Sequence, residues 1–222
     1  FHVTGVQTCA LPISFSVGNA ARLLRARGAA MQEAVPVGVG AMAALLGLDF
    51  DAARAVAEEA AAGEVCEAAN DNDPGQVVVS GHKAAVERAV EIAKAKGAKR
   101  ALLLPVSAPF HCSLMAPAAE MMAKALDEVA ISAPTVPVVS NVLAEGVTDP
   151  AHIRALLVDQ ITGSVRWRES GGYRAAKGVT EVFELGAGKA LSGMVKRIDR
   201  ALTATAVSTP ENVQAMAAQV NA

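Results

Sequence analysis

The sequence predicts an α/β fold in which strands and helices alternate along most of the chain. Short apolar runs bounded by turn residues recur between longer segments whose apolar residues follow helical spacing. Glycine or proline lies at the ends of most of the expected helices. The 222 residues are 52% hydrophobic and 19% charged, which is enough apolar material for a sizeable core. From the alternation we expect a parallel-type sheet covered by helices.

Residues 1–14 are set apart from this fold. They have neither the basic start nor the apolar centre of a signal peptide. Between Val3 and Ile13 they resemble the translation of a common sequencing-library adapter. We therefore expect a non-native leader over 1–14 and a natural protein that begins near Phe15.

The first expected helix runs from Ser16 to Ala34. Its apolar residues fall near helical spacing, and Pro36 closes the region: the residues concerned are Val17, Ala20, Ala21, Leu24 and Met31. Arg27 lies in the second half of this helix.

Residues 37–106 carry a strand–helix–strand–strand–helix–strand pattern. The expected strands cover 39–48, 65–69, 76–80 and 99–106, with helices after Asp49 and around Val86. The run from Asn70 to Gly75 reads as a dense turn. This βαββαβ order is that of a ferredoxin-like subdomain, which we expect to be self-contained.

The α/β pattern resumes after His111. Helices are expected over 113–129, from Asp149-Pro150 onward, over 167–177, from the glycines at 186 and 188 to about Arg200, and from Thr209 to the end. Strands are expected over 136–140, 179–185 and 203–207. We assign 15–36 and 107–222 to one large domain into which 37–106 is inserted.

Charge and cysteine content exclude several classes of protein. The net charge is −2 and no basic stripe is present, so nothing favours nucleic-acid binding. No apolar run reaches the roughly 18 residues of a membrane span. The three cysteines lack CxxC spacing, which argues against a disulfide framework or a zinc site and makes a reducing cytoplasm the default.

Candidate chemistry is concentrated in a few residues. His111 lies in a proline-rich loop between an expected strand and helix, where catalytic groups often occur, although a lone histidine is more often structural. Arg27 could clamp a carboxylate or be simply solvated. Cys112 is expected to be a buried structural thiol, and Ser107 to support the loop. Gly186-Ala-Gly188 is a weak nucleotide motif that better suits close strand–helix packing.

Taken in order, the motifs resemble those of one family, the malonyl-CoA:acyl carrier protein transacylases of type II fatty acid synthesis. The resemblance runs from about Phe15 to Val207. It rests on R-G-x-x-M-Q-E-A-V-P from Arg27, N-D-N-D-P-G-Q-V from Asn70, P-V-S-A-P-F-H-C from Pro105, the segment from Gln160 to V-R-W at Trp167, and L-G-A-G-K-A-L-S-G-M-V-K-R from Leu185. Ala187 stands where the family usually has proline.

The resemblance implies an α/β-hydrolase-like large domain with the inserted ferredoxin-like subdomain. It also implies a ping-pong mechanism, in which a serine takes the malonyl group from malonyl-CoA and passes it to the phosphopantetheine thiol of acyl carrier protein. In family terms His111 is the general base, Gln160 orients it, Arg27 holds the malonyl carboxylate, and Asn70 and Asn72 form a turn near the substrate entrance. No cofactor or metal is implied, and a cytoplasmic monomer is expected.

The family's serine is missing from the 222 residues. Its G-H-S-x-G turn is expected about two dozen residues before Arg27, within or ahead of the leader, and no G-x-S-x-G occurs in the sequence. We therefore expect a truncated chain that is inactive as it stands. Two alternatives stay open: an acyltransferase domain of a polyketide synthase, and a non-catalytic ferredoxin-like binding module.

Overall fold

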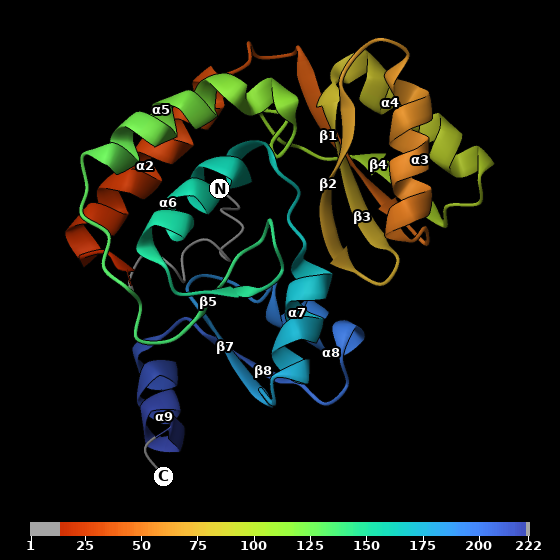
Figure 1. The fold of residues 1–222 in the computed structure, drawn as a ribbon. Coiled ribbons are helices and arrows are strands. Elements are labelled where there is room, and N and C mark those ends of the chain that lie inside the picture. Colours follow the sequence, from red (N-terminus) through yellow and green to blue (C-terminus); the bar gives the residue numbers. More distant parts are fainter. Residues whose placement is uncertain (1–13, 221–222) are drawn as a thin grey trace. The chain divides into compact units, whose positions relative to one another are not determined.

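A computed structural model describes residues 14–220 of the protein (Figure 1). The chain divides into two compact units, one ending at Ser170 and the other beginning at Gly171. Each unit is described by itself. The domain boundaries expected at 36 and 107 remain a prediction.

The largest sheet of the first unit has four strands: β1 (Gly40–Leu46), β2 (Cys66–Asp73), β3 (Gln76–His82) and β4 (Arg100–Leu103). Their order in the sheet is β2-β3-β1-β4, and every neighbouring pair is antiparallel. Helices α3 (Phe50–Ala61) and α4 (Lys83–Ala95) connect them, so the expected succession of elements along the chain is present. The parallel-type sheet expected from the overall alternation is not found in these four strands: β2 and β3 are joined by a tight turn, and β1 lies between β3 and β4, antiparallel to both.

Helices α3 and α4 pack against each other and on the same face of this sheet (Figure 1). Their buried faces are made mainly of alanine and valine: Ala53, Val56, Ala57 and Ala60 on α3, and Ala85, Val86, Ala89, Val90 and Ala93 on α4. Leu45, Val77 and Val79 of the sheet are fully buried against them. Small side chains let the helices approach the sheet closely, and each buried valine or leucine contributes about 1.5–3 kcal/mol to folding.

The expected turn from Asn70 to Gly75 is mostly strand. Residues up to Asp73 belong to β2, and the turn is confined to Pro74-Gly75, with Gly75 at φ 85°. Register shifts between Ala68 and Asn70 and between Asp71 and Asp73 mark irregular pairing with β3. The turn propensity of these polar residues is overridden because β3 on one side and Val165 on the other take up their main-chain hydrogen bonds.

A second core joins the helices of the first unit. These are α2 (Val17–Glu33), α5 (Ala116–Asp127), which follows the short turn η2 (Ser113–Met115), and α6 (Pro150–Thr162). Helix α2 lies along α5, and α5 packs on α6 (Figure 1). The buried face of α2 is Ala20, Leu23 and Met31; Val17, expected in it, is 77% exposed.

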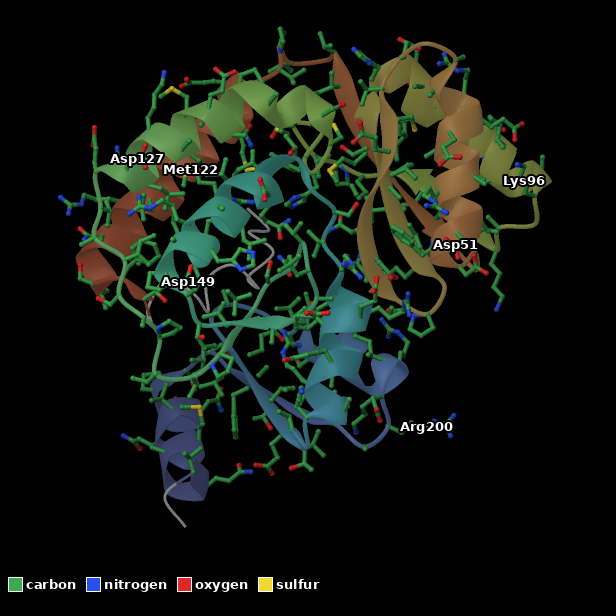
Figure 2. All side chains as sticks on the ribbon, viewed as in Figure 1. Asp51, Lys96, Met122, Asp127, Asp149 and Arg200 are labelled. Carbon is green, nitrogen blue, oxygen red and sulfur yellow. The ribbon has the colours of Figure 1, made fainter. Side chains whose placement is uncertain are left out.

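Side-chain caps fix the starts of three helices, two of them at the aspartates where helix starts were expected. Asp149 accepts a hydrogen bond from the amide of His152 at the start of α6, where Figure 2 labels it, and Asp49 and Ser16 cap α3 and α2 in the same way. The expected strand at 136–140 is a two-residue strand, β5 (Val138–Val139), paired antiparallel with β6 (Gly146–Val147). Helix α7 (Trp167–Ala176) begins in the first unit.

The second unit contains a parallel pair of strands, β7 (Glu181–Leu185) and β8 (Thr203–Val207), as the alternation predicted. Helix α8 (Ser192–Ile198) is shorter than expected, because the chain after Gly188 becomes helical only where Glu184 accepts hydrogen bonds from the amides of Leu191 and Ser192. Helix α9 (Pro210–Val220) follows. Over 14–220, no helix is both long enough and apolar enough to cross a bilayer.

Gly81 offers a test of the sheet geometry. A Cβ atom added there would lie 2.0 Å from the carbonyl oxygen of Val65, so Gly81→Ala forces the main chain at the start of the neighbouring strand β2 to move. We expect Gly81→Ala to lower the free energy of unfolding by about 1–3 kcal/mol or more. In contrast, Gly28→Ala in α2 meets nothing within 4 Å and should be neutral or stabilising by up to about 1 kcal/mol. Urea unfolding of both variants checks this; equal effects would contradict the close approach.

Candidate active site

His111 lies in a buried turn between β4 and η2. Its backbone is left-handed, with φ 59°, which is uncommon for a residue other than glycine. The turn is held by a hydrogen bond from the amide of Phe110 to the carbonyl of Ala108 and by the thiol of Cys112, which donates to the carbonyl of Pro109. His111 itself is only 6% exposed. The unusual backbone therefore aims the imidazole into the protein rather than toward solvent.

The imidazole of His111 meets the last turns of α6. Its Nδ1 lies 3.0 Å from the main-chain carbonyl oxygen of Gln160. This carbonyl is one of the last four of α6, which have no partner within the helix. Because a carbonyl can only accept, Nδ1 must carry the proton, and Nε2 is the unprotonated nitrogen.

The side chain of Gln160 also lies next to the His111 imidazole, at the end of α6. It is 1% exposed, and its amide donates to the carbonyl of Gly163 at 3.1 Å while its Nε2 lies 3.4 Å from His111 Nδ1. The structure therefore brings the two predicted residues together, with the main chain of Gln160 as the hydrogen-bond acceptor.

Burial lowers the pKa of His111 to about 4, and the charge of Arg27 acts in the same direction. Hydrogen bonds to the carbonyls of Gln160 and Gly163 oppose this shift without cancelling it. At neutral pH the imidazole is therefore uncharged, with a free lone pair on Nε2. Such a group can accept a proton from a nearby hydroxyl or thiol.

Arg27 is half-buried on α2, and its positive charge contributes to the lowered pKa of His111. Burial lowers its pKa to about 10, so it keeps its charge at neutral pH. Its buried Nε has no hydrogen-bond partner anywhere in the described part of the chain. A guanidinium with a free Nε–H donor, whose charge acts on a neutral imidazole, is suited to bind a carboxylate on a substrate.

Asn70 and Asn72 lie in β2 and do not form the turn that was expected. Asn70 is buried and bridges to Val165, and Asn72 is half-buried in the same strand. Within residues 14–220, neither side chain forms a hydrogen bond with His111, Gln160 or Arg27. The pairing of β2 with both β3 and Val165 explains the difference.

The other candidate side chains take structural positions. Cys112 is fully buried and burial raises its pKa to about 11, while that of Cys66 is raised to about 12, so neither is a thiolate at neutral pH. Ser107 donates a 2.7 Å hydrogen bond to the side chain of Gln32, tying its loop to the end of α2. Over 14–220, no three His, Cys, Asp or Glu side chains gather as a metal site would require.

Two carboxylates of β2 lie near the site but were not among the predicted site residues. Glu67 bonds to Ser113, two residues beyond His111, and Asp71 pairs with Arg168 in the first turn of α7. Glu67 lay in the strand expected over 65–69, and Asp71 in the turn expected from Asn70 to Gly75, so the alternation of a strand that carries both carboxylates to one edge was not recognised.

The sequence of this chain matches a known protein family and several relatives. The acyl transferase domain model matches residues 9–213. The chain is 50% identical over 211 residues to the malonyl CoA-acyl carrier protein transacylase of Salmonella typhimurium, covering 95% of this chain and 68% of the relative. It is 46% identical over 202 residues to that of Bacillus subtilis, covering 90% and 64%. The chain thus spans about two thirds of the length of these relatives.

Solved structures agree with these matches. The acyl-carrier-protein-S-malonyltransferase of Bartonella henselae superposes with a TM-score of 0.94 at 48% identity, covering 100% of this chain and 71% of that one. A malonyl-transacylase solved in complex with a type II polyketide synthase acyl-carrier protein has a TM-score of 0.89 at 42% identity, covering 96% and 68%.

The depressed pKa of His111 predicts how stability depends on pH. As pH falls below 6.5 the unfolded chain binds a proton that folded His111 resists down to about pH 4, so folding loses up to about 3 kcal/mol across this window. Above pH 6.5 both states are neutral at this group and the penalty is absent.

The variant His111→Asn removes this titration while tolerating the left-handed backbone. Between about pH 7 and about pH 4.5, urea unfolding should show the variant losing about 2–3 kcal/mol less stability than the unchanged protein. An identical loss in both would contradict a buried, neutral His111.

Proposed function

The chain belongs to the acyl transferase domain family, among the malonyl CoA-acyl carrier protein transacylases, and on this premise we propose that it is the larger part of an enzyme that transfers malonyl groups from malonyl-CoA to acyl carrier protein. The observation that carries the proposal is a neutral His111, held as the Nδ1–H tautomer by Gln160, together with the charge of Arg27, which acts on this histidine and whose buried Nε has no hydrogen-bond partner within residues 14–220. We assign this activity to fatty acid synthesis.

In the proposed mechanism His111 Nε2 takes the proton of a serine hydroxyl as the serine oxygen attacks the malonyl thioester carbon. The C–S bond breaks, coenzyme A leaves as its thiol with the proton from Nε2, and a malonyl-serine ester remains. The phosphopantetheine thiol of acyl carrier protein then gives its proton to Nε2 and attacks the ester. The serine leaves and recovers the proton, so His111 ends as it began.

The Gln160 carbonyl stabilises the imidazolium that forms between these transfers, because it accepts from Nδ1 throughout. The low pKa of His111 favours rapid return of the proton to the leaving group. No cofactor of the enzyme's own takes part in this scheme; the pantetheine belongs to the partner.

In the proposed enzyme, Arg27 selects the malonyl group over the acetyl group. Malonyl differs from acetyl by a carboxylate, and a guanidinium can hold both oxygens of that group through parallel N–H donors. A buried, unpartnered Nε leaves Arg27 able to do so.

The proposed domain organisation follows the same family. We assign residues 37–106 to a ferredoxin-like subdomain inserted into an α/β-hydrolase-like large domain made of 15–36 and 107–222. The strand order β2-β3-β1-β4 with two helices on one face supports the subdomain. We further propose that the enzyme is a cytoplasmic monomer.

One solved neighbour favours a second setting for the same chemistry. Its title names a type II polyketide synthase acyl-carrier protein bound to its malonyl-transacylase, at 42% identity to this chain. Transfer to the carrier of a polyketide pathway is therefore the alternative to fatty acid synthesis. A binding module without catalysis is disfavoured, because the family match extends far beyond the ferredoxin-like segment.

Arg27→Ala tests the role of the guanidinium in the 222-residue chain. We expect the unchanged chain to bind malonyl-CoA more tightly than acetyl-CoA, and the variant to lose about 10- to 100-fold in malonyl-CoA affinity only, since a hydrogen bond to a charged group contributes about 1.5–3 kcal/mol. Titration calorimetry with both ligands measures this. Arg25→Ala, on an exposed position of the same helix, is the matched control and should change neither affinity. A malonyl preference that survives Arg27→Ala would show that another group selects the substrate.

Covalent labelling tests the nucleophile. Because the 222 residues contain no G-x-S-x-G, incubation with malonyl-CoA should add no malonyl mass to this chain. The same chain preceded by an upstream segment that encodes G-H-S-x-G should gain one malonyl group and pass it to acyl carrier protein. Intact mass spectrometry reads both results. An adduct on the shorter chain refutes its inactivity, whereas no adduct on the longer one overturns the proposed function.

A further inference from the structure

We propose that strand β2 positions the catalytic pair, with Glu67 fixing the loop that carries His111 and Asp71 fixing the segment that follows Gln160. This inference rests on the proposed function, because it explains how His111, the base of the proposed malonyl transfer, is held in place. Neither carboxylate contacts His111 among the described residues, so both are positioning residues.

Glu67 holds the loop of His111 from its C-terminal side. One carboxylate oxygen accepts from the hydroxyl of Ser113 at 2.6 Å and the other from the amide of Ser113 at 3.2 Å. This amide opens η2, whose preceding residue, Cys112, supplies no side-chain cap. Glu67 therefore satisfies a donor that the helix start leaves open, through two charge-assisted bonds to a residue two positions beyond His111.

The free edge of β2 holds the chain that follows α6. Strand β2 is the outer strand of its sheet, and its outward groups pair with Ser164 and Val165. The amide of Val165 donates to Ala69 at 2.8 Å, and the amide of Asp71 donates to Val165 at 2.9 Å. Gly163, which accepts from the Gln160 side chain, directly precedes this contact. An edge that would otherwise be exposed is thereby used to anchor the end of α6.

Asp71 locks this contact with an ion pair. It is 1% exposed, and Arg168 reaches both of its oxygens, with Nε at 3.1 and 2.9 Å and a terminal nitrogen 2.8 Å from Oδ2. Arg168 is 39% exposed, so the pair is buried on the carboxylate side. A buried carboxylate without a cationic partner is strongly unfavourable, so Asp71 needs Arg168. The two-pronged contact also fixes the position of Arg168 relative to β2. The two residues are separated by 97 positions in the sequence.

The two anchors converge on one hydrogen bond. The His111 loop and the end of α6 meet where Nδ1 contacts the Gln160 carbonyl at 3.0 Å, and hydrogen bonds weaken steeply once distance or angle departs from such values. One strand attached to both segments fixes their separation. Loosening either anchor should therefore release Nδ1 before the fold is lost.

The tautomer of His111 provides a direct test in the 222-residue chain, without acyl transfer. Long-range ¹H–¹⁵N spectra of the histidine-labelled protein distinguish Nδ1–H from Nε2–H rings and give each pKa, and His111→Asn assigns the His111 signals. In the unchanged protein His111 should be Nδ1–H. In Asp71→Asn and Glu67→Gln we expect a mixture of tautomers and a pKa of His111 that rises by about 1 or more toward 6.5.

His82 is a built-in control for folding. Its Nδ1 accepts a 2.9 Å hydrogen bond from the amide of Val65, so its ring must be the opposite tautomer, Nε2–H, as long as the sheet is intact. Glu64→Gln is the matched control variant, since it removes the charge of a carboxylate paired at 2.7 Å with Arg88 just before β2 and touches neither anchor. It should leave both histidines unchanged.

The outcomes separate the explanations. If His82 keeps its tautomer while His111 changes in Asp71→Asn and Glu67→Gln, the positioning role is supported. If both histidines stay as they were, the proposal is wrong. If His82 also changes, the milder variants Arg168→Lys and Ser113→Ala decide, each expected to shift His111 alone in the same direction; no shift in either overturns the proposal. A longer chain that fails to transfer malonyl while these shifts occur would refute the proposed function and leave the positioning role standing.

Discussion

The hydrogen bond from His111 Nδ1 to the main-chain carbonyl of Gln160 is the contact on which the site depends. It exists because α6 ends two residues later and leaves this carbonyl without a partner in the helix. It also requires the left-handed backbone of His111, which turns the imidazole inward. Since a carbonyl cannot donate, one contact fixes both the orientation and the tautomer of the ring, and Nε2 is the nitrogen available for chemistry.

The electrostatics of the site favour a neutral base beside a permanent cation. Burial and the nearby charge of Arg27 both disfavour a second positive charge, so the imidazole stays unprotonated although an arginine remains charged in the same region. The proposed reaction needs this combination, because a base must be unprotonated to accept a proton and a malonyl group must be recognised by a cation. A carboxylate bound at Arg27 would offset part of its charge and ease proton uptake by His111 during the reaction.

The antiparallel sheet connects to this site through its outer strand. Its own stability comes from alanine- and valine-rich packing of α3 and α4, which involves none of the candidate residues. Strand β2 has one side in that sheet and the other against residues 164–168, and its acidic side chains reach segments far apart in the sequence. A scaffold whose core is independent of the site can hold the site rigidly and still tolerate substitutions there.

Local features of the sequence determined much of this protein. Periodicity predicted the helices α3 and α4, the aspartates at 49 and 149 predicted two helix starts, and the ordered motifs indicated the family and the candidate residues His111, Gln160 and Arg27. Caps and periodicity depend on residues three or four positions apart, so they can be read from one segment. The tertiary structure alone decided that Asn70 lies in a strand, that the main-chain carbonyl of Gln160 meets His111, and that Asp71 pairs with Arg168. Each of these depends on which distant segment supplies the hydrogen-bond partner, and no local pattern encodes that choice.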